Sequence, residues 1–427
     1  MQVAFETLGC RLNEAESESW ARRFRAQGAA VVPVAQADVV VLNTCAVTGE
    51  AMRKSRQIIR RLKRANPQAR LVVSGCYATL HPAEVAKALG VDLVIPNQDK
   101  DRLVELTREI LPERIPAPTA QDAAVFAASR QRAFIKVQDG CRHRCTFCIV
   151  TVARGRERSR PVADIVAELR QLCAAGIREA VLSGVHLGGY GSDLGIGLSD
   201  LVRAVLEETD LPRLRLGSLE PWELSEDFFA LLEHPRLMPH LHLPLQSGSD
   251  PVLKRMARRC RRDDFHRLVD RARNHRPDLT VTTDIIVGFP GETERDFEQS
   301  LTLAEEIGFA HIHIFPYSPR QGTAAAGFPD QIPNQVKKAR SRRLHQLAAS
   351  LRRQVLTSHL GLIQPVLWER GRAEADRQLF TGYTPHYLRV QVKVPPDLDL
   401  TNSITPTRLT AVTEAGDQLV GALDAGH

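Results

Sequence analysis

The sequence predicts an α/β protein of three parts: an N-terminal α/β sheet, a central open barrel of six parallel strands, and a small C-terminal β-barrel. The chain has 427 residues, of which 43% are hydrophobic, so it can hold about three domains of roughly 150 residues each. Strand-like and helix-like segments alternate through the first two parts, which indicates parallel sheets. After about residue 358, short β runs are separated by Gly and Pro, which is typical of a small all-β barrel.

The sequence composition bears on where in the cell the protein is expected to lie. The first residues, MQVAFETLGC, lack the basic and apolar runs of an export signal, and no stretch of 18 apolar residues occurs. We therefore expect a cytoplasmic protein that does not insert into a membrane. Disulfides are rare in the cytosol, so the eight cysteines need another explanation, and clustered cysteines favour metal binding.

Three cysteines of the N-terminal part occupy equivalent positions. Cys10, Cys45 and Cys76 each follow a short apolar, strand-like run and precede a helix-like run. Loops at the carboxyl ends of parallel strands are where α/β domains place ligands, so these cysteines can converge although they are distant in sequence. A single cysteine there is more often a small buried residue, but three together predict a ligand site. Cys173 and Cys260 do not occupy equivalent positions near other cysteines and are interpreted as structural.

Many cations lie between the second and third of these cysteines. Residues 51–70, AMRKSRQIIRRLKRANPQAR, contain no acidic residue and have apolar residues at helical spacing, which predicts an amphipathic helix with a cationic face. Further basic runs span Lys254–Arg262 and Lys337–Arg353, and the net charge is +7. A charge run is commonly only a solvated face. Three such runs nevertheless favour a polyanionic partner, because Lys and Arg gain affinity by releasing phosphate counterions.

A second cysteine group lies in VQDGCRHRCTFCIV, residues 137–150, where Cys141, Cys145 and Cys148 are spaced by three and then two residues. Three thiolates can hold a [4Fe-4S] cluster and leave its fourth iron free for a reactive ligand. The alternative is structural zinc with His143 as a fourth ligand. The spacing favours the cluster.

Six β-rich segments follow one another from the strand that precedes this loop. They are AFIKVQ (133–138), EAVLS (179–183), RLRLGS (213–218), HLHLPL (240–245), VTTDIIVGF (281–289) and AHIHIFPYS (310–318). Helix-like stretches lie between most of them, so we expect a parallel, six-stranded open barrel. In such barrels chemistry gathers in the loops that follow the strands, and the cysteine loop follows the first strand.

The cysteine loop resembles the CxxxCxxC motif of radical S-adenosylmethionine (SAM) enzymes, including an aromatic residue, Phe147, before the last cysteine. The resemblance implies that the open iron binds SAM and that the reduced cluster cleaves it to a 5′-deoxyadenosyl radical. Small and polar residues follow the other strands, either as ordinary tight turns or as parts of a SAM pocket. The loops are Ser183–His186, Ser218–Pro221, Gln246–Ser249 and Gly288–Glu292. With Phe147, the expected SAM-binding residues are Ser183, Gly184, Glu220 and Gln246.

The C-terminal runs PVLWE and GYTPHYLRVQV resemble the TRAM domain of RNA-modifying enzymes. Tyr383, His386 and Tyr387 could stack on bases, or they could be core and strand-surface residues. From residue 361 onward acidic residues outnumber basic ones. This part is therefore not itself a basic patch, which keeps a protein substrate open as an alternative to RNA.

Essentially the whole chain resembles the radical SAM methylthiotransferases. The matching motifs include TLGCRLNEAES, LNTCAVT, SGCYA, GCRHRCTFCIVTVARGRERSRP, HLPLQSGSDPVLKRMARR, TTDIIVGFPGET and HIFPYSPRQGTAAA. The resemblance implies a flavodoxin- or Rossmann-like N-terminal domain (1–112), a linker (113–130), a radical SAM barrel (131–358) and a TRAM-like domain (359–427). It also implies that Cys10, Cys45 and Cys76 bind a second [4Fe-4S] cluster, whose open iron holds the sulfur to be transferred.

The motifs look most like the branch that modifies carbon 2 of threonylcarbamoyl adenosine beside the tRNA anticodon. The alternatives are isopentenyl adenosine of tRNA, an aspartate of a ribosomal protein and, outside catalysis, an iron-sulfur protein that binds RNA or carries electrons. The expected partners are the tRNA anticodon stem-loop, an electron donor such as flavodoxin or ferredoxin, and a sulfur donor. Arg154, Arg156 and Arg158 are candidate partners of the threonyl carboxylate.

Overall fold

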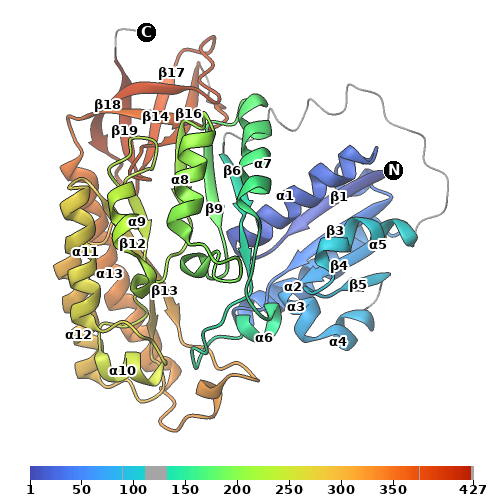
Figure 1. Cartoon of the computed structure of the whole chain (residues 1–427), viewed down its shortest axis with the longest axis horizontal. Coiled ribbons are helices and arrows are strands. Elements are labelled where there is room, and N and C mark those ends of the chain that lie inside the picture. The colour runs from blue at the N-terminus through green and yellow to red at the C-terminus, as the bar shows by residue number, and fades with distance from the viewer. Residues whose placement is uncertain (89, 111–131, 375, 425–427) are drawn as a thin grey trace.

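The computed structural model describes residues 1–88, 90–110, 132–374 and 376–424. An N-terminal α/β unit, a central barrel and a C-terminal β-barrel are arranged side by side (Figure 1). The expected linker at 113–130 lies outside the described residues. Within the described ranges, no helix is long and apolar enough to cross a membrane.

The N-terminal unit is a five-stranded parallel sheet with helices on both faces. Its strands are β1 (Gln2–Thr7), β2 (Ala30–Val31), β3 (Val39–Thr44), β4 (Arg70–Gly75) and β5 (Leu93–Ile95). Its α-helices are α1 (Arg11–Ala26), α2 (Gly49–Ala65), α3 (Cys76–Leu80), α4 (Pro82–Ala86) and α5 (Leu103–Glu109). The central strand β3 is buried along its whole length, because apolar residues of α1 and α5 cover one face and those of α2 to α4 cover the other.

The order of the strands in this sheet is β2-β1-β3-β4-β5, which is the flavodoxin-like order. In such sheets ligands bind outside the carboxyl ends of the strands, at the point between β1 and β3 where the order reverses. Cys10, Cys45 and Cys76 follow β1, β3 and β4, which are neighbours in the sheet. The prediction that the three loops share one edge is therefore confirmed.

The central part contains all six predicted parallel strands. They are β6 (Arg132–Lys136), β9 (Glu179–Ser183), β10 (Arg213–Leu216), β11 (His240–His242), β12 (Thr280–Val287) and β13 (His311–Pro316). They form two three-stranded parallel sheets, β6-β9-β10 and β11-β12-β13. Parallel bridges from Leu214 to Leu237 and from Ser218 to His242 join the two sheets, and β6 and β13 are not paired with each other, so the barrel is open.

Helices cover the outer face of this barrel, and a large apolar core lies between them and the strands. The helices are α6 (Val150–Arg154), α7 (Val162–Ala174), α8 (Leu198–Glu208), α9 (Glu226–Leu231), α10 (Asp250–Arg255), α11 (Arg262–His275), α12 (Glu294–Ile307) and α13 (Asn334–Ser358). A short hairpin of β7 (Gln138–Asp139) and β8 (Arg158–Ser159) brackets the cysteine loop. Successive side chains of β6 point to opposite faces of the sheet. Phe134 points away from the large core and packs with Ala15 of α1 and Val181 of β9. The helix α1 therefore packs directly on the barrel.

The C-terminal part is an antiparallel-rich barrel. Its strands are β14 (Ile363–Trp368), β15 (Arg372–Glu374), β16 (Arg377–Tyr383), β17 (Arg389–Val394), β18 (Ile404–Val412) and β19 (Leu419–Leu423). Pairing of β14 with both β18 and β16 closes the barrel. Its core contains the buried residues Trp368, Phe380 and Val390.

The aromatic residues proposed to stack on bases are instead engaged inside the chain. The rings of Tyr383 and Tyr387 stack on each other at 5.1 Å, and the Arg132 guanidinium lies over both. Tyr387 also accepts a hydrogen bond from Arg11 of the N-terminal unit, and His386 is buried beside Asp278. These contacts favour the second interpretation of the sequence, packing, because the rings join the C-terminal barrel to the other two parts.

Candidate functional site

The three N-terminal cysteines lie together at the carboxyl edge of the sheet. Gly9 has φ of +130°, and a Cβ at this position would lie 2.9 Å from the Cys45 Cβ and 3.3 Å from its Sγ. The loops of Cys10 and Cys45 can approach this closely because residue 9 is glycine. Desolvation raises the pKa of the Cys10 thiol, although the residue as a whole is exposed, and burial raises the pKa of Cys45 to about 11; in both thiols the neighbouring Cys76 adds to the increase.

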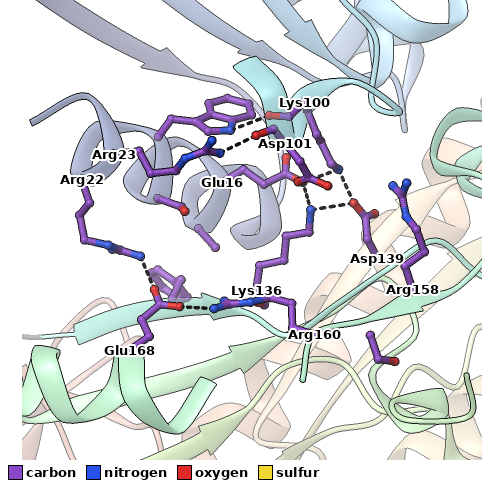
Figure 2. A pocket seen from close by; sticks show the side chains of 15 residues that line it. Glu16, Arg22, Arg23, Lys100, Asp101, Lys136, Asp139, Arg158, Arg160 and Glu168 are labelled. Carbon is purple, nitrogen blue, oxygen red and sulfur yellow. Dashed lines mark hydrogen bonds and ion pairs between the residues drawn. The ribbon is translucent and has the colours of Figure 1, made fainter. Parts of the chain in front are cut away.

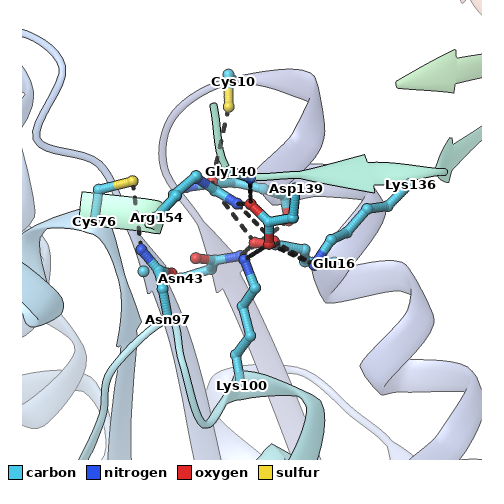
Figure 3. Close-up of polar contacts among 12 residues, drawn as sticks. Cys10, Glu16, Asn43, Cys76, Asn97, Lys100, Lys136, Asp139, Gly140 and Arg154 are labelled. Atoms are coloured by element: carbon cyan, nitrogen blue, oxygen red, sulfur yellow. Dashed lines mark hydrogen bonds and ion pairs between the residues drawn. The ribbon is translucent and has the colours of Figure 1, made fainter. Parts of the chain in front are cut away.

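Asparagine side chains fix the loops that carry these thiols. Asn13 Nδ2 donates to the carbonyls of Leu8 at 2.8 Å and Thr44 at 3.1 Å, which ties the β1 loop to the β3 loop. Asn97 Nδ2 donates to the Cys76 Sγ at 3.8 Å and to the Ala153 carbonyl at 2.8 Å (Figure 3). One amide therefore connects the N-terminal cysteines with α6 of the barrel.

The second cysteine group lies in the loop between β7 and α6, as the sequence predicts. The backbone N–H of His143 donates to the Cys141 Sγ, and that of Val150 donates to the Cys148 Sγ, both at 3.4 Å. Burial raises the pKa of Cys141 to about 12 and that of Cys148 to about 11. Metals bind the thiolate form, so a positively charged metal group would stabilise these half-buried sulfurs in their ionised state.

The spacing of the sulfurs distinguishes a cluster from a zinc site. In a tetrahedral zinc site with Zn–S bonds of about 2.3 Å, the sulfurs are about 3.8 Å apart. In the described part of the chain, no three cysteine sulfurs lie within 4.8 Å of one another. A [4Fe-4S] cluster spreads its thiolates because each binds a different iron. The sulfurs of neither triad therefore have the spacing of a preformed site for a single zinc ion.

The proposed fourth zinc ligand is engaged elsewhere. His143 Nε2 lies 2.9 Å from His186 Nε2 and 3.1 Å from Glu223 Oε1. The His186 ring also contacts Glu157, and Cys141 is near this group. This group contains only one cysteine, and its two histidines and two carboxylates already pair with one another. We interpret the group as a brace of the cysteine loop, which does not support zinc.

The expected SAM-binding residues differ in how closely the structure relates them to the second triad. Glu220 lies near the triad, because its charge helps to raise the pKa values of both Cys145 and Cys148, in which desolvation is the largest cause. The Phe147 ring meets Phe289 edge to face at 6.5 Å, and Gln246 has φ of 71°. Ser183 is buried, and Gly184 packs against Gln138, whose Oε1 would lie 2.9 Å from a Cβ there. Their contacts with SAM stay a prediction.

Arg258 is a site residue that the sequence interpretation missed. Its NH2 pairs with Glu220 Oε2 at 2.7 Å, its guanidinium lies over the Trp222 ring at 4.4 Å, and its NH1 is 4.0 Å from the Cys145 Sγ. It belongs to a basic run that was interpreted only as a surface for a polyanion. The one feature of the sequence that could have indicated its role is its position shortly after the Gln246 loop, which was expected to bind SAM.

A buried charge network joins the N-terminal unit to the barrel (Figure 3). Arg154 NH1 lies 2.8 Å from Glu16 Oε1 and 3.1 Å from Asp139 Oδ1. Lys100 Nζ lies 2.5 Å from Glu16 Oε1, and Lys136 Nζ lies 2.8 Å from Asp139 Oδ2. Four of the five side chains are at most 4% exposed, and Lys136 is 17% exposed. The carboxylates come from α1 and β7, so the network closes the junction between the two parts.

This network changes the interpretation of the three arginines that follow the cysteine loop. Arg154 donates to Asn13 Oδ1 at 2.7 Å in addition to its two carboxylates, so its guanidinium is already saturated and is a poor partner for a substrate carboxylate. Arg156 and Arg158 are exposed and have no ion pair within the described residues, which leaves them as candidates.

A pocket of about 320 Å³ opens beside the network, between α1 and β6 (Figure 2). Glu168 pairs with both Arg22 and Arg160 in its wall, and Arg158 also lines it. None of the residues expected to bind SAM lines this pocket. We interpret it as a charged gap at the junction rather than as the cofactor site.

Arg320, in the loop after β13, is the second residue that the sequence interpretation missed. It is 6% exposed, and its Nε and NH2 atoms are buried without a hydrogen-bond partner. Burial lowers its pKa, and the nearby Cys45 thiolate opposes this. An orphaned buried guanidinium beside a cysteine triad indicates that an anionic group belongs in this space.

Comparisons with known proteins agree with this geometry. Residues 2–96 match the model described as uncharacterized protein family UPF0004, and residues 135–304 match the radical SAM superfamily. The threonylcarbamoyladenosine tRNA methylthiotransferase MtaB of Bacillus subtilis is 36% identical over 411 residues, covering 93% of this chain and 91% of the relative. A tRNA-2-methylthio-N(6)-dimethylallyladenosine synthase of Cereibacter sphaeroides is 38% identical over 407 residues, covering 92% of each chain.

Among solved structures, the radical S-adenosylmethionine methyltransferase TsrM from Kitasatospora setae, with cobalamin and a [4Fe-4S] cluster bound, has a similar fold. The TM-score is 0.56 at 16% identity, over 76% of this chain and 77% of that one. At this identity the likeness concerns the fold alone.

The buried network generates a prediction about stability. Replacing Glu16 by Gln removes one of the two carboxylates that the three cations share and leaves Asp139 alone to compensate them. We expect the free energy of unfolding to fall by about 3–5 kcal/mol. Glu105→Gln is the matched control, because its pair with Arg23 is exposed and should contribute less than about 1 kcal/mol. Urea denaturation measures both, and equal effects of the two substitutions would show that the network does not stabilise the junction.

The same network predicts a pH dependence. Burial would raise the pKa of Glu16, but Arg154, Lys100 and Lys136 hold it well below its usual range, and the same cations act on Asp139. Carboxyl groups with lowered folded-state pKa values stabilise the fold above their unfolded pKa, near 4, and this contribution is lost as pH falls below it. Wild-type stability should therefore fall more steeply below about pH 4 than that of Glu16→Gln.

Proposed function

The chain belongs to the tRNA methylthiotransferases, a family of radical SAM enzymes, and on this premise we propose that it transfers a methylthio group to carbon 2 of threonylcarbamoyl adenosine beside the tRNA anticodon. Relatives with that activity in their names match more than 80% of this chain at 36% identity. Isopentenyl adenosine is the competing substrate, since relatives named for that product are equally similar.

The observation that supports this proposal most strongly is the connection between the two cysteine triads. The helix α6 begins two residues after Cys148, and Asn97 links it to Cys76. Arg154 lies at the end of α6, and the charges of both Cys76 and Cys10 act on its guanidinium and help to raise its pKa. Two sites joined in this way suit a reaction in which one site activates SAM while the other delivers sulfur.

We assign Cys141, Cys145 and Cys148 to the cluster that binds SAM, and Cys10, Cys45 and Cys76 to a second [4Fe-4S] cluster. Bound there, these groups would supply reductive cleavage of SAM at the first site and the sulfur for transfer at the second. The reaction also needs an electron donor, for which a flavodoxin or ferredoxin is suitable, and a source of sulfur.

The side chains around the first site hold the cysteine loop in position. Arg258 keeps the negative charge of Glu220 paired next to the Cys145 sulfur. His186 and Glu223 fix the position of His143 within the cysteine loop. Preorganised charges of this kind need no rearrangement when a ligand binds.

The helix α2 is the surface most suited to the tRNA backbone. Its cationic residues are largely exposed, and Arg53 and Arg60 have no acidic side-chain partner among the residues that the structure describes. All three basic runs contain paired cations, but the pairs of α2 lie at the surface, whereas Arg258 and Arg340 of the other runs pair in buried positions. We therefore assign the phosphate contacts mainly to α2, which begins four residues after Cys45.

Replacing each triad by alanine separates its role. Anaerobically reconstituted wild-type protein should hold about eight irons per chain, and either triple variant about four. Without Cys141, Cys145 and Cys148, formation of 5′-deoxyadenosine should stop. Without Cys10, Cys45 and Cys76, 5′-deoxyadenosine should still form while methylthio transfer ends. A wild-type protein that never exceeds about four irons contradicts the two-cluster assignment.

The identity of the substrate is tested by mass spectrometry of tRNA nucleosides from a strain that lacks the gene. We expect the methylthio derivative of threonylcarbamoyl adenosine to disappear and to return on complementation with wild type but not with a Cys141→Ala variant. Loss of the isopentenyl product, or of a methylthio aspartate in a ribosomal protein, with the threonylcarbamoyl product unchanged would contradict the proposed substrate.

A further inference from the structure

Arg320 has an unusual position for a charged residue. It lies between β13 and α13, and 94% of its surface is removed from solvent (6% exposed). Within the described residues its guanidinium forms no hydrogen bond or ion pair, and two of its three nitrogens are fully buried and unpaired. A buried, unpaired charge is strongly unfavourable. The arginine therefore needs an anion that the polypeptide itself does not provide.

The guanidinium lies against the N-terminus of α2. A Cβ built on Gly49, the first residue of that helix, would lie 3.4 Å from Arg320 NH1 and 3.7 Å from NH2. The first N–H groups of a helix have no acceptor within it, and they carry partial positive charge. Thr48 Oγ1 accepts from the third N–H group of α2 at 3.1 Å, so the first two are the ones available to an anion. Glu50 does not neutralise this end, because it is exposed and pairs with Lys54 at 2.9 Å. Two sources of positive charge therefore meet here.

Cys45 is the nearest anion-forming group of the triad to this positive region. It precedes Gly49 by four residues and is 6% exposed, and its thiolate acts electrostatically on Arg320. A phosphate of the substrate RNA would come from solution and could meet only NH1, because the Nε and NH2 atoms of Arg320 are buried. The location favours an anion that resides inside the protein.

We propose that Arg320 and the N-terminus of α2 form the anion-binding side of the second cluster site, where they hold negatively charged sulfur next to Cys45. The ligand is the sulfur of the cluster at Cys10, Cys45 and Cys76, together with a hydrosulfide or thiolate at its open iron. The inference rests on the proposed function, which places a cluster there. Arg320 is thus a positioning residue for the sulfur that is transferred.

Two measurable properties follow from this role. Hydrogen bonds and positive charge near a cluster favour its more negative, reduced form and so raise its reduction potential. Retention of a sulfur anion should weaken by roughly tenfold or more when a charged hydrogen-bond donor is removed. In the metal-free chain, by contrast, Arg320 is an uncompensated charge, and its removal should not destabilise the fold.

The test uses the full-length protein with Cys141, Cys145 and Cys148 replaced by Ala, so that only the second cluster is present. Arg320→Gln, Arg320→Lys and the control Arg53→Gln are added to this background. Arg53 is the matched control because it is an exposed cation one turn along α2. Potentiometric titration followed by electron paramagnetic resonance gives the midpoint potential, and titration with sodium hydrosulfide gives the affinity of the open iron.

We expect Arg320→Gln to make the midpoint potential more negative and to weaken hydrosulfide binding about tenfold or more. Arg320→Lys should lie between it and the parent, since it keeps the charge and loses the planar fork. Arg53→Gln should match the parent in midpoint potential and hydrosulfide affinity, because the charge of Arg53 is assigned to tRNA phosphates and not to the cluster. Urea denaturation of the metal-free protein should show no loss of stability in Arg320→Gln.

Three outcomes would overturn this inference. One is an unchanged midpoint and hydrosulfide affinity in Arg320→Gln. Another is destabilisation of the metal-free variant, which would make Arg320 an ordinary structural residue. The third is a loss confined to tRNA affinity, which would make this a phosphate site. If the parent variant itself holds no iron, the cluster assignment under the proposed function fails instead, so the two failures are distinguishable.

Discussion

The buried ion network between α1 and the barrel is the interaction on which the rest of the structure depends. Glu16 and Asp139 bring carboxylates from two parts of the chain to the same three cations. Desolvation of these charges is compensated only when the parts are docked, because each carboxylate then meets several cations. The docking places α6, and with it the second cysteine loop, against the edge that carries Cys76.

Both cysteine triads share a second constraint, which is desolvation of their thiols: two cysteines of the first triad are buried, and the second triad is half-buried. The thiols of Cys45, Cys141 and Cys148 have pKa values of about 11 to 12 because burial disfavours their charged form. A ligand that binds thiolates must supply the missing positive charge. The protein prepares for this with backbone N–H groups at the second triad and with cations, Arg258 and Arg320, near one cysteine of each triad.

Much of this arrangement could be predicted from the sequence, because it depends on local patterns. Cys10, Cys45 and Cys76 follow strands of one parallel sheet, and strand ends share an edge whatever the details of packing. The other contributions are non-local. Arg154 meets Glu16 across 138 positions of sequence, and the base-stacking interpretation of Tyr387 did not anticipate its contact with Arg11, 376 positions away. The role of Arg320 could not be predicted from neighbouring residues in the sequence, since only the docked structure shows that its guanidinium is buried without a partner among the described residues.

The central claim is that two separate iron clusters occupy the two triads of one docked structure. The most direct measurement is anomalous X-ray diffraction at the iron edge from anaerobically grown crystals of the reconstituted protein. The account predicts two distinct iron peaks, one enclosed by Cys10, Cys45 and Cys76 and the other by Cys141, Cys145 and Cys148. Iron at only one triad, or a peak at the zinc edge in either position, would contradict it.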